Sequence, residues 1–320
     1  MKIALVGAGM IAHEVLGVFE KYFKSKIEVV SVYSRFRTVE KAKKLAQEYQ
    51  IPAVFTIYDE MMAQEDIDFV YVANANSVHY EYARMALESG HNVIVEKPIC
   101  PTMQETQDLV QLALRNHLFL FEAVSLLHLP NMKKVGELLP ELGKIKIVNC
   151  NYSQYSSRYD RYLQHDVAPA FDPHCAGGAL LDLNIYNVNF VVGLFGMPVG
   201  AQYYPNKGFN GVDTSGVLAL RYPTFVATCI GAKDCAGPSH CTIQGEKGWL
   251  QIEGAPNELK EIKICTGGKI RTYALNVYKH RLVHEFEEFL EIYEEQNFEK
   301  MKSFLDISLN VMKTLNMTRG

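Results

Sequence analysis

The stretch KIALVGAGMIAHEV, residues 2–15, decides the fold of this chain. Its first half is a short apolar run typical of a buried strand, and its second half opens an amphipathic helical pattern. Between them the spacing G-x-G-x-x-A puts Gly7 in a tight turn, Gly9 where a phosphate can approach the backbone, and Ala12 where a helix packs closely on a strand. A helix N-terminus after such a turn attracts a pyrophosphate. We therefore expect a dinucleotide-binding loop rather than an ordinary glycine turn, with contacts from Gly7, Ala8, Gly9, Met10 and Ile11.

The same alternation of strand and helix continues to residue 122. Short apolar runs at 27–33, 53–55, 69–73, 93–96 and 118–121 mostly lack the period-two pattern of a half-exposed sheet. Such runs are typical of strands that are covered on both faces. One helix is expected to begin at Thr102, because Glu105 stands at the capping-box spacing. This rhythm predicts an α/β fold with a doubly wound parallel sheet of the Rossmann type over residues 1–122.

Residues 123–320 show a different pattern. Strand-like runs at 144–154, 215–222, 225–232, 240–244, 249–252, 262–265 and 270–274 are separated by turns rich in Gly, Pro and Asn, and the chain ends in helices. Residues 183–206 carry no charge and are long enough to span a bilayer, but their asparagines, glycines and prolines favour a buried helix followed by a strand. We expect an α+β domain here, built on a large, mostly antiparallel sheet that helices can cover on one face while the other stays open.

Composition narrows the class of protein. At about 150 residues per domain, the 320 residues suit two domains. The net charge of −4, without a basic cluster, argues against a nucleic-acid partner, and no segment is expected to enter a membrane. The seven cysteines contain no C-x-x-C pair, which favours a reducing compartment and hence the cytoplasm.

The segment after the 27–33 run distinguishes between the two nicotinamide dinucleotides. An NAD site usually places a carboxylate about 20 residues beyond the glycines, whereas this chain has Ser34, followed by Arg35 and Arg37. A hydroxyl group and guanidinium groups suit a 2′-phosphate, and no carboxylate is present to repel it. The sequence therefore predicts NADP(H), with NAD(H) less favoured; two solvated arginines on a loop are the alternative.

Glu96-Lys97-Pro98 ends the 93–96 run. Ligands of open α/β sheets bind beyond the carboxyl ends of the strands. Lys97 is therefore expected beside the nicotinamide, although a surface lysine before a proline turn is the alternative for this motif alone.

Four motifs together resemble the glucose–fructose oxidoreductase/inositol dehydrogenase/MocA (Gfo/Idh/MocA) family. They are the glycine loop, Ala73-Asn-Ala-Asn-Ser-Val-His79, Glu96-Lys97-Pro98 and Gly177-Gly-Ala-Leu-Leu-Asp182. The resemblance covers essentially the whole chain, and Asp182-Leu-Asn-Ile-Tyr186 is similar to the dihydrodiol-dehydrogenase branch. It implies NAD or NADP as cofactor, and sugars, cyclitols, diols or related carbonyl compounds as substrates. It also implies that residues 123–320 form a substrate-binding and oligomerisation domain, whose open sheet mediates a homodimer or homotetramer.

The resemblance also implies the site residues. Lys97 and Tyr186 would handle the proton of the substrate oxygen, and Asp182, at a helical spacing of four from Tyr186, would orient either this pair or the substrate. Two positions depart from the common pattern, because Asn74-Ala75 replaces Thr-Pro and Asn184 replaces Gly. A core tyrosine is the alternative for Tyr186. The remaining expected contacts are Ala73, Asn74, Asn76, His79 and Glu96 for the cofactor, and Asn184, Arg158 and Tyr159 for the substrate, with a solvated loop as the alternative for the last two.

The predicted function is an NADP(H)-dependent oxidoreductase that transfers a hydride between nicotinamide and a CH–OH or carbonyl carbon. A non-enzymatic NADP sensor on the same fold is the alternative from another class, because fold does not determine function. The presence of both Lys97 and Tyr186 favours the enzyme, since a sensor needs neither. A biliverdin-reductase-like or purely sugar-directed activity is a further alternative. His79, His165, Asp172 and His174 lack the spacing of metal ligands, so no metal site is expected.

Overall fold

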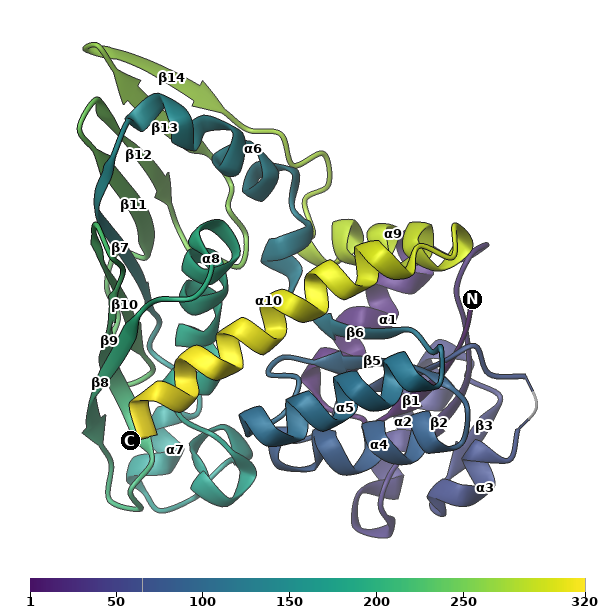
Figure 1. The fold of residues 1–320 in the computed structure, drawn as a ribbon. Helices are drawn as coiled ribbons and strands as arrows, with labels where there is room; N and C mark the ends of the chain where they lie inside the picture. Colours follow the sequence, from purple (N-terminus) through teal and green to yellow (C-terminus); the bar gives the residue numbers. More distant parts are fainter. Residues whose placement is uncertain (65, 320) are drawn as a thin grey trace. The chain divides into compact units, whose positions relative to one another are not determined.

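The computed structural model describes residues 1–64 and 66–319, and the chain divides into two compact units (Figure 1). Unit 1 comprises Met1–Ala123 and Phe286–Leu305, and unit 2 comprises Val124–Glu285 and the chain from Asp306 onwards. The first change of unit lies next to the predicted boundary at residue 122. The sequence prediction, however, assigns Phe286–Leu305 to the second domain, and here the structure differs.

Unit 1 contains a six-stranded sheet in which all neighbouring strands are parallel. Its order is β3-β2-β1-β4-β5-β6, so the strand order reverses between β1 and β4, where doubly wound sheets bind ligands. The residues of β4 are fully buried, as expected for a strand covered on both faces. The strands are β1 (Lys2–Val6), β2 (Glu28–Tyr33), β3 (Ala53–Phe55), β4 (Phe69–Val72), β5 (Asn92–Glu96) and β6 (Leu120–Ala123).

Helices connect these strands and cover the sheet. In α5 the predicted capping box is confirmed, because the Glu105 amide donates to the Thr102 hydroxyl at 3.3 Å and the Glu105 carboxylate accepts from the Thr102 amide at 3.1 Å. Helices α4 and α5 lie side by side (Figure 1). The helices are α1 (Met10–Tyr22), α2 (Val39–Tyr49), α3 (Tyr58–Met62), α4 (His79–Glu88) and α5 (Met103–Arg115), with short 3₁₀ turns η1 (Phe36–Thr38) and η2 (Asn76–Val78).

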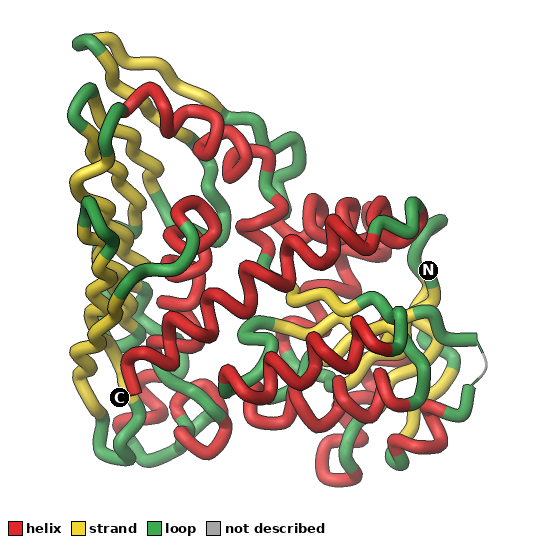
Figure 2. The backbone as a smooth tube through the Cα atoms, viewed as in Figure 1, coloured by secondary structure: helices red, strands yellow, loops and turns green. Residues whose placement is uncertain are grey.

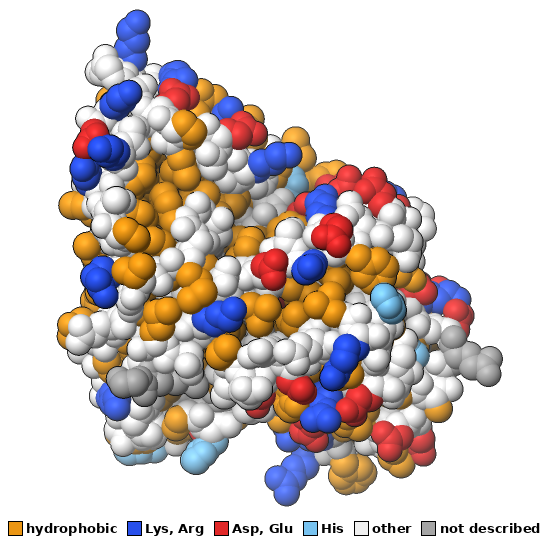
Figure 3. Space-filling view, in the orientation of Figure 1, with side chains coloured by type: hydrophobic (Ala, Val, Ile, Leu, Met, Phe, Trp, Pro, Cys, Tyr) orange, Lys and Arg blue, Asp and Glu red, His pale blue; other side chains and the backbone are white. Residues whose placement is uncertain are grey.

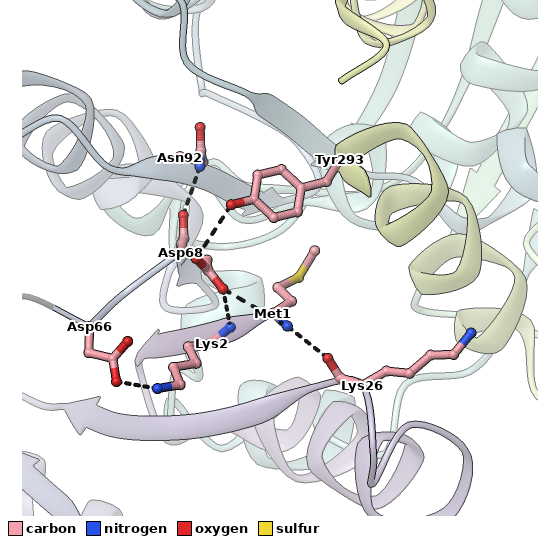
Figure 4. A network of polar contacts seen from close by, with 7 residues as sticks. All are labelled: Met1, Lys2, Lys26, Asp66, Asp68, Asn92 and Tyr293. Atoms are coloured by element: carbon pink, nitrogen blue, oxygen red, sulfur yellow. Dashed lines mark hydrogen bonds and ion pairs between the residues drawn. The ribbon is translucent and has the colours of Figure 1, made fainter. Parts of the chain in front are cut away.

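Aromatic packing explains why Phe286–Leu305 belongs to unit 1. This segment contains most of α9 (Arg281–Glu294) and the start of α10 (Phe298–Asn316). The Phe289 ring stacks on Phe121 of β6 at 4.4 Å between centroids. Tyr293 also donates a hydrogen bond to the Asp68 carboxylate at 3.4 Å, and Asp68 in turn accepts from the Lys2 amide at 2.7 Å (Figure 4). A chain segment far away in sequence thus completes the first domain.

Unit 2 contains an eight-stranded sheet with the order β14-β13-β12-β11-β7-β10-β9-β8 (Figure 1). Its strands appear as a yellow layer in Figure 2. Only β7 and β10 pair in parallel among its neighbouring strands, so the expectation of a mostly antiparallel sheet is confirmed. The strands are β7 (Ile145–Ser153), β8 (Gly200–Lys207), β9 (Asp213–Arg221), β10 (Val226–Ala232), β11 (His240–Gly245), β12 (Gly248–Glu253), β13 (Ile262–Thr266) and β14 (Lys269–Tyr273).

One face of this sheet is buried beneath helices. Cys150, Cys229 and Cys241 form a cross-strand row on that face and are fully buried. Helix α8 (Ile185–Phe195) contacts β7 and β10, and the π-helical turn η7 (Leu180–Asn184) leads into it. By length and composition Pro173–Phe195 could cross a membrane, but 67% of its apolar window is buried inside the structure, as expected for a core helix. Other helical segments are η3 (Ser125–His128), α6 (Pro130–Leu138), η4 (Leu139–Leu142), α7 (Tyr159–Leu163), η5 (Pro169–Phe171), η6 (Pro173–Cys175) and η8 (Met317–Arg319).

The opposite face of the same sheet carries apolar side chains that remain exposed. Ile147 on β7 and Val226 on β10 are neighbours in register and are about half exposed, at 50% and 49%. Tyr204, Val217 and Ile270 extend the patch along the same face. On the edge strand β14 the basic residues Lys269 and Arg271 alternate with Ile270, and basic side chains gather at that end of the sheet in Figure 3, where they discourage edge-to-edge pairing.

Candidate functional site

The glycine loop of unit 1 has the geometry of a phosphate cradle. Gly7 follows β1 with φ +111°, and a Cβ atom there would lie 2.9 Å from the Ala73 carbonyl oxygen, so only glycine fits. At Gly9 a Cβ would meet nothing within 4 Å. No side chain caps α1, and its first turn contains no acidic residue. A dinucleotide pyrophosphate therefore fits at this helix N-terminus on the residues present.

The turn after β2 presents two arginines. The Ser34 side chain is only 5% exposed, and its hydroxyl lies 2.6 Å from the Thr38 hydroxyl. Ser34 thus shapes the turn, which the sequence prediction did not anticipate, whereas Arg35 and Arg37 point outward as exposed residues. Within residues 1–64 and 66–319 neither arginine forms an ion pair. The turn is therefore a cationic surface without a competing carboxylate.

His79 joins the loop after β4 to the loop after β5. It is fully buried, and its imidazole lies between two carbonyl oxygens, that of Pro98 at 2.8 Å from Nδ1 and that of Asn74 at 3.2 Å from Nε2. Burial lowers the pKa of His79, which favours the neutral ring. This position argues against a direct cofactor contact and makes His79 a positioning residue for both loops.

The end of β5 places Lys97. Glu96 is buried, and its carboxylate accepts a hydrogen bond from the Tyr71 hydroxyl and one from the Lys97 amide at 3.3 Å. The Lys97–Pro98 peptide is cis, and the next amide, that of Ile99, donates to Glu122 at 2.9 Å. Two buried carboxylates therefore anchor the turn, while the Lys97 side chain is half-buried. Glu96, expected as a cofactor contact, supports the main chain here.

In unit 2 the G-G-A-L-L-D motif forms the entry to η7. Gly178 has φ +118°, and the lack of a side chain lets the Asp213 carboxylate approach closely. Asp213 accepts hydrogen bonds from the Leu180 amide and the Tyr203 hydroxyl, both at 2.7 Å. Burial raises the pKa of Asp213, and these hydrogen bonds oppose that shift. A carboxylate distant in sequence thus anchors the π-helical turn.

Asp182 lies within this turn, and Tyr186 lies in the first turn of α8. The Asp182 carboxylate forms an ion pair with Lys233 at 2.8 Å, and its side chain is 31% exposed. Tyr186 is 7% exposed, and its ring lies 6.0 Å from that of Tyr152. The π-helical geometry differs from the regular helix that the spacing predicts, and such turns often occur at functional sites.

The three residues expected to contact the substrate lie in different surroundings. Asn184 is fully buried, its Nδ2 donates to the Cys229 carbonyl at 2.9 Å, and its Oδ1 accepts from Asn187 at 2.8 Å. These bonds argue against Asn184 as a substrate contact. Tyr159 packs on Phe171 at 5.8 Å between centroids, within an aromatic cluster. Arg158 precedes α7 and is half-buried, so its predicted role stays a prediction.

Sequence reasoning did not single out Lys233, which pairs with the candidate site residue Asp182. Lys233 follows β10 and is 2% exposed. A single lysine after an apolar run carries no signal of burial, because its partner Asp182 stands far away in sequence. Lys97 belongs to unit 1, whereas Asp182, Tyr186 and Lys233 belong to unit 2.

Comparisons with known proteins agree with this architecture. Residues 1–123 match the model of an oxidoreductase family with an NAD-binding Rossmann fold, and residues 138–251 match the Gfo/Idh/MocA C-terminal domain. The chain is 30% identical over 293 residues to the scyllo-inositol 2-dehydrogenase (NADP(+)) IolU of Bacillus subtilis, which covers 91% of this chain and 88% of that protein. It is 28% identical over 279 residues to trans-1,2-dihydrobenzene-1,2-diol dehydrogenase of Xenopus tropicalis, covering 85% and 80%.

A solved structure shows the same fold. The 3-ketoreductase KijD10 of Actinomadura kijaniata, in complex with TDP-benzene and NADP, superposes with a TM-score of 0.83 at 20% identity, covering 100% of this chain and 96% of that one. With both domain models matched and relatives aligned over most of both lengths, this chain belongs to the Gfo/Idh/MocA family of oxidoreductases with an NAD(P)-binding Rossmann fold.

Proposed function

We propose that this protein is an NADP(H)-dependent oxidoreductase that transfers a hydride between nicotinamide and a CH–OH or carbonyl carbon of a sugar, cyclitol, diol or related small molecule. The observation that carries the proposal is the presence of Lys97 at the end of β5 and of Asp182 and Tyr186 at the η7–α8 junction. The names of the relatives narrow the substrate class, because inositol and the dihydrodiol both carry adjacent hydroxyl groups on a six-membered ring.

The preference for NADP(H) rests on the turn after β2. Arg35 and Arg37 are exposed, and no described carboxylate pairs with them. Guanidinium groups bind a phosphate through charge-assisted, often bidentate hydrogen bonds. The IolU dehydrogenase, an NADP(+) enzyme by name, supports the same choice.

The cofactor supplies the hydride chemistry, and the residues of this chain supply positioning and the proton. Lys97 and Tyr186 exchange a proton with the substrate oxygen. Asp182 accepts a hydrogen bond from a substrate hydroxyl and orients it. A sensor that merely binds the dinucleotide needs none of these three groups.

A substrate panel tests the proposal. The protein is incubated with NADP⁺ and scyllo-inositol, or with NADP⁺ and trans-1,2-dihydrobenzene-1,2-diol, and NADPH formation is followed by absorbance. The reverse reaction is followed with NADPH and the ketone of scyllo-inositol, because the ketone of the dihydrodiol tautomerises to catechol. We expect oxidation of at least one cyclic vicinal diol. Tight NADPH binding without turnover in either direction would favour the sensor instead.

We also propose that the open face of the unit 2 sheet joins copies of this chain into a homodimer or homotetramer. The patch around Ile147, Val226 and Val217 supports this, because exposed apolar sheet faces usually mark an interface. Buried thiols at Cys150, Cys229 and Cys241 without disulfides support the cytoplasm as the location.

A further inference from the structure

The Lys233 side chain ends in a closed environment within unit 2. Its ammonium group donates to the Ala170 carbonyl, pairs with the Asp182 carboxylate at 2.8 Å, and lies 4.3 Å from the centroid of the Phe171 ring. The side chain is 2% exposed. Burying an ammonium group is costly unless a charged partner and hydrogen bonds compensate. Asp182 is the partner that compensates here.

Main-chain contacts hold the stem of Lys233 in place. Its amide donates to the Thr214 carbonyl at 2.8 Å, and its carbonyl accepts from the Ser156 amide at 2.9 Å. The following carboxylate, Asp234, accepts from the hydroxyl groups of Thr214 at 2.6 Å and Ser215 at 2.9 Å. The Lys233 side chain therefore starts from a strand end whose backbone is fixed by hydrogen bonds.

The backbone of the turn that carries Asp182 has its own anchor. Asp213 binds the Leu180 amide at 2.7 Å, and Gly178 makes room for it. The main chain of η7 is thus held without Lys233. The ion pair with Lys233 therefore acts on the side chain of Asp182, because it fixes the direction in which the carboxylate points.

We propose that Lys233 is a positioning residue for the reaction, whose buried ammonium group holds the Asp182 carboxylate and aims it at the substrate hydroxyl. This inference rests on the proposed function, because it assumes that Asp182 orients the substrate. Asp182 is suited to the task, since one of its oxygens is held by Lys233 while its side chain stays 31% exposed. Lys233 itself, at 2% exposure, acts only through Asp182.

A double-mutant cycle tests the inference. It compares Lys233→Met, Asp182→Asn and the double variant with the wild type, using NADP⁺ and scyllo-inositol, or the dihydrodiol if the wild type prefers it. We expect Lys233→Met to lower kcat by roughly 10- to 100-fold, the size of a misplacement effect, with little change in NADPH affinity. In the Asp182→Asn background the same substitution should cost less than about 2-fold in kcat, because residues that act as a unit are not additive.

Two further variants separate positioning from packing. Lys233→Arg retains the charge and should recover most of kcat. Lys263→Met removes a half-exposed ion pair with Glu253 on the same sheet and should leave kcat unchanged. If Lys233→Met does not fold, Lys233→Gln, which keeps an N–H donor without the charge, takes its place in the cycle.

The possible outcomes distinguish a failure of the inference about Lys233 from a failure of the proposed function. Equal losses from Lys233→Met in both backgrounds, with Asp182→Asn itself impaired, would overturn the role of Lys233 and leave the proposed function standing. Wild-type turnover in Asp182→Asn would overturn the proposed role of Asp182 and the inference with it.

Discussion

The two sheets of this protein position functional groups in different ways. The unit 1 sheet is parallel, its central strands are buried on both faces, and its candidate groups follow the carboxyl ends of β1, β2, β4 and β5. The unit 2 sheet is mostly antiparallel, and its candidate groups lie on η7 and α8, which pack on one face. In unit 1 a motif directly after a strand is enough to place a residue. In unit 2 the placement depends on contacts between distant segments.

The largest expected effect comes from Lys97 and Tyr186, the residues that we propose handle the proton, one in each unit. Tyr186→Phe removes the hydroxyl and preserves the ring, so turnover should fall by roughly 10²–10⁴-fold, the usual size of an acid–base contribution. Lys97→Met should be at least as damaging. NADPH affinity, measured by calorimetry on the same samples, should change little. Near-normal turnover in Tyr186→Phe would make Tyr186 a packing residue and place the proton chemistry on Lys97 or another group.

The next largest expected effect is a loss of NADPH affinity and concerns a residue of unit 1. Arg35→Ala removes one charge-assisted phosphate contact, which contributes about 1.5–3 kcal/mol, or roughly 10- to 150-fold in NADPH affinity. NADH affinity should stay nearly unchanged, because NADH lacks the 2′-phosphate. Calorimetric titration of both cofactors measures this, with Lys43→Ala on the exposed face of α2 as the control. Equal affinity of the wild type for both cofactors would contradict the NADP(H) assignment.

The open face of unit 2 offers a test of the contrast between the sheets. Ile147→Lys places a charge in the middle of the exposed apolar patch, so self-association should weaken by about 10- to 100-fold, because a lysine buried at an interface needs a partner. Light scattering at micromolar concentration should then approach the monomer mass of 36.2 kDa. Ile57→Lys, at a similarly exposed position in unit 1, is the control. A wild type that is already monomeric would overturn the proposed assembly.

The smallest expected effects come from two glycines of the same loop, one of which should affect stability and the other NADPH affinity. Gly7→Ala meets the Ala73 carbonyl and a positive φ, so it should destabilise the protein by roughly 1–3 kcal/mol in urea unfolding. Gly9→Ala meets nothing within 4 Å, with φ −89°, so stability should hold while NADPH affinity falls. Unchanged NADPH affinity in Gly9→Ala would show that the phosphate does not approach this position.

Sequence patterns located most elements but not all partners. The strand runs and the Thr102 capping box were predictable, because burial and capping leave local signatures. The assignment of Phe286–Leu305 to unit 1 was not predictable from the sequence. Phe289 and Tyr293 form an ordinary apolar helix face, and the residues they pack against, such as Phe121, lie far away in the sequence. The support that His79 and Glu96 give to neighbouring main chain was not predictable either, because their hydrogen-bond partners Pro98 and Tyr71 come from other segments. The contacts of Ser34, His79 and Glu96 with the cofactor stay predictions.

The sequence by itself determined the family, the dinucleotide loop and the two types of sheet, since glycine spacing and hydrophobic periodicity act within a few residues. Tertiary structure alone decided that Asp182 sits in a π-helical turn, that Asp213 anchors this turn, and that Lys233 is buried against Asp182. Asp182 and Lys233 stand on different elements, η7 and the end of β10. Only the packing of η7 against β10 brings the Lys233 ammonium group and the Asp182 carboxylate to 2.8 Å from each other, where the burial of Lys233 reduces the screening of their attraction by water.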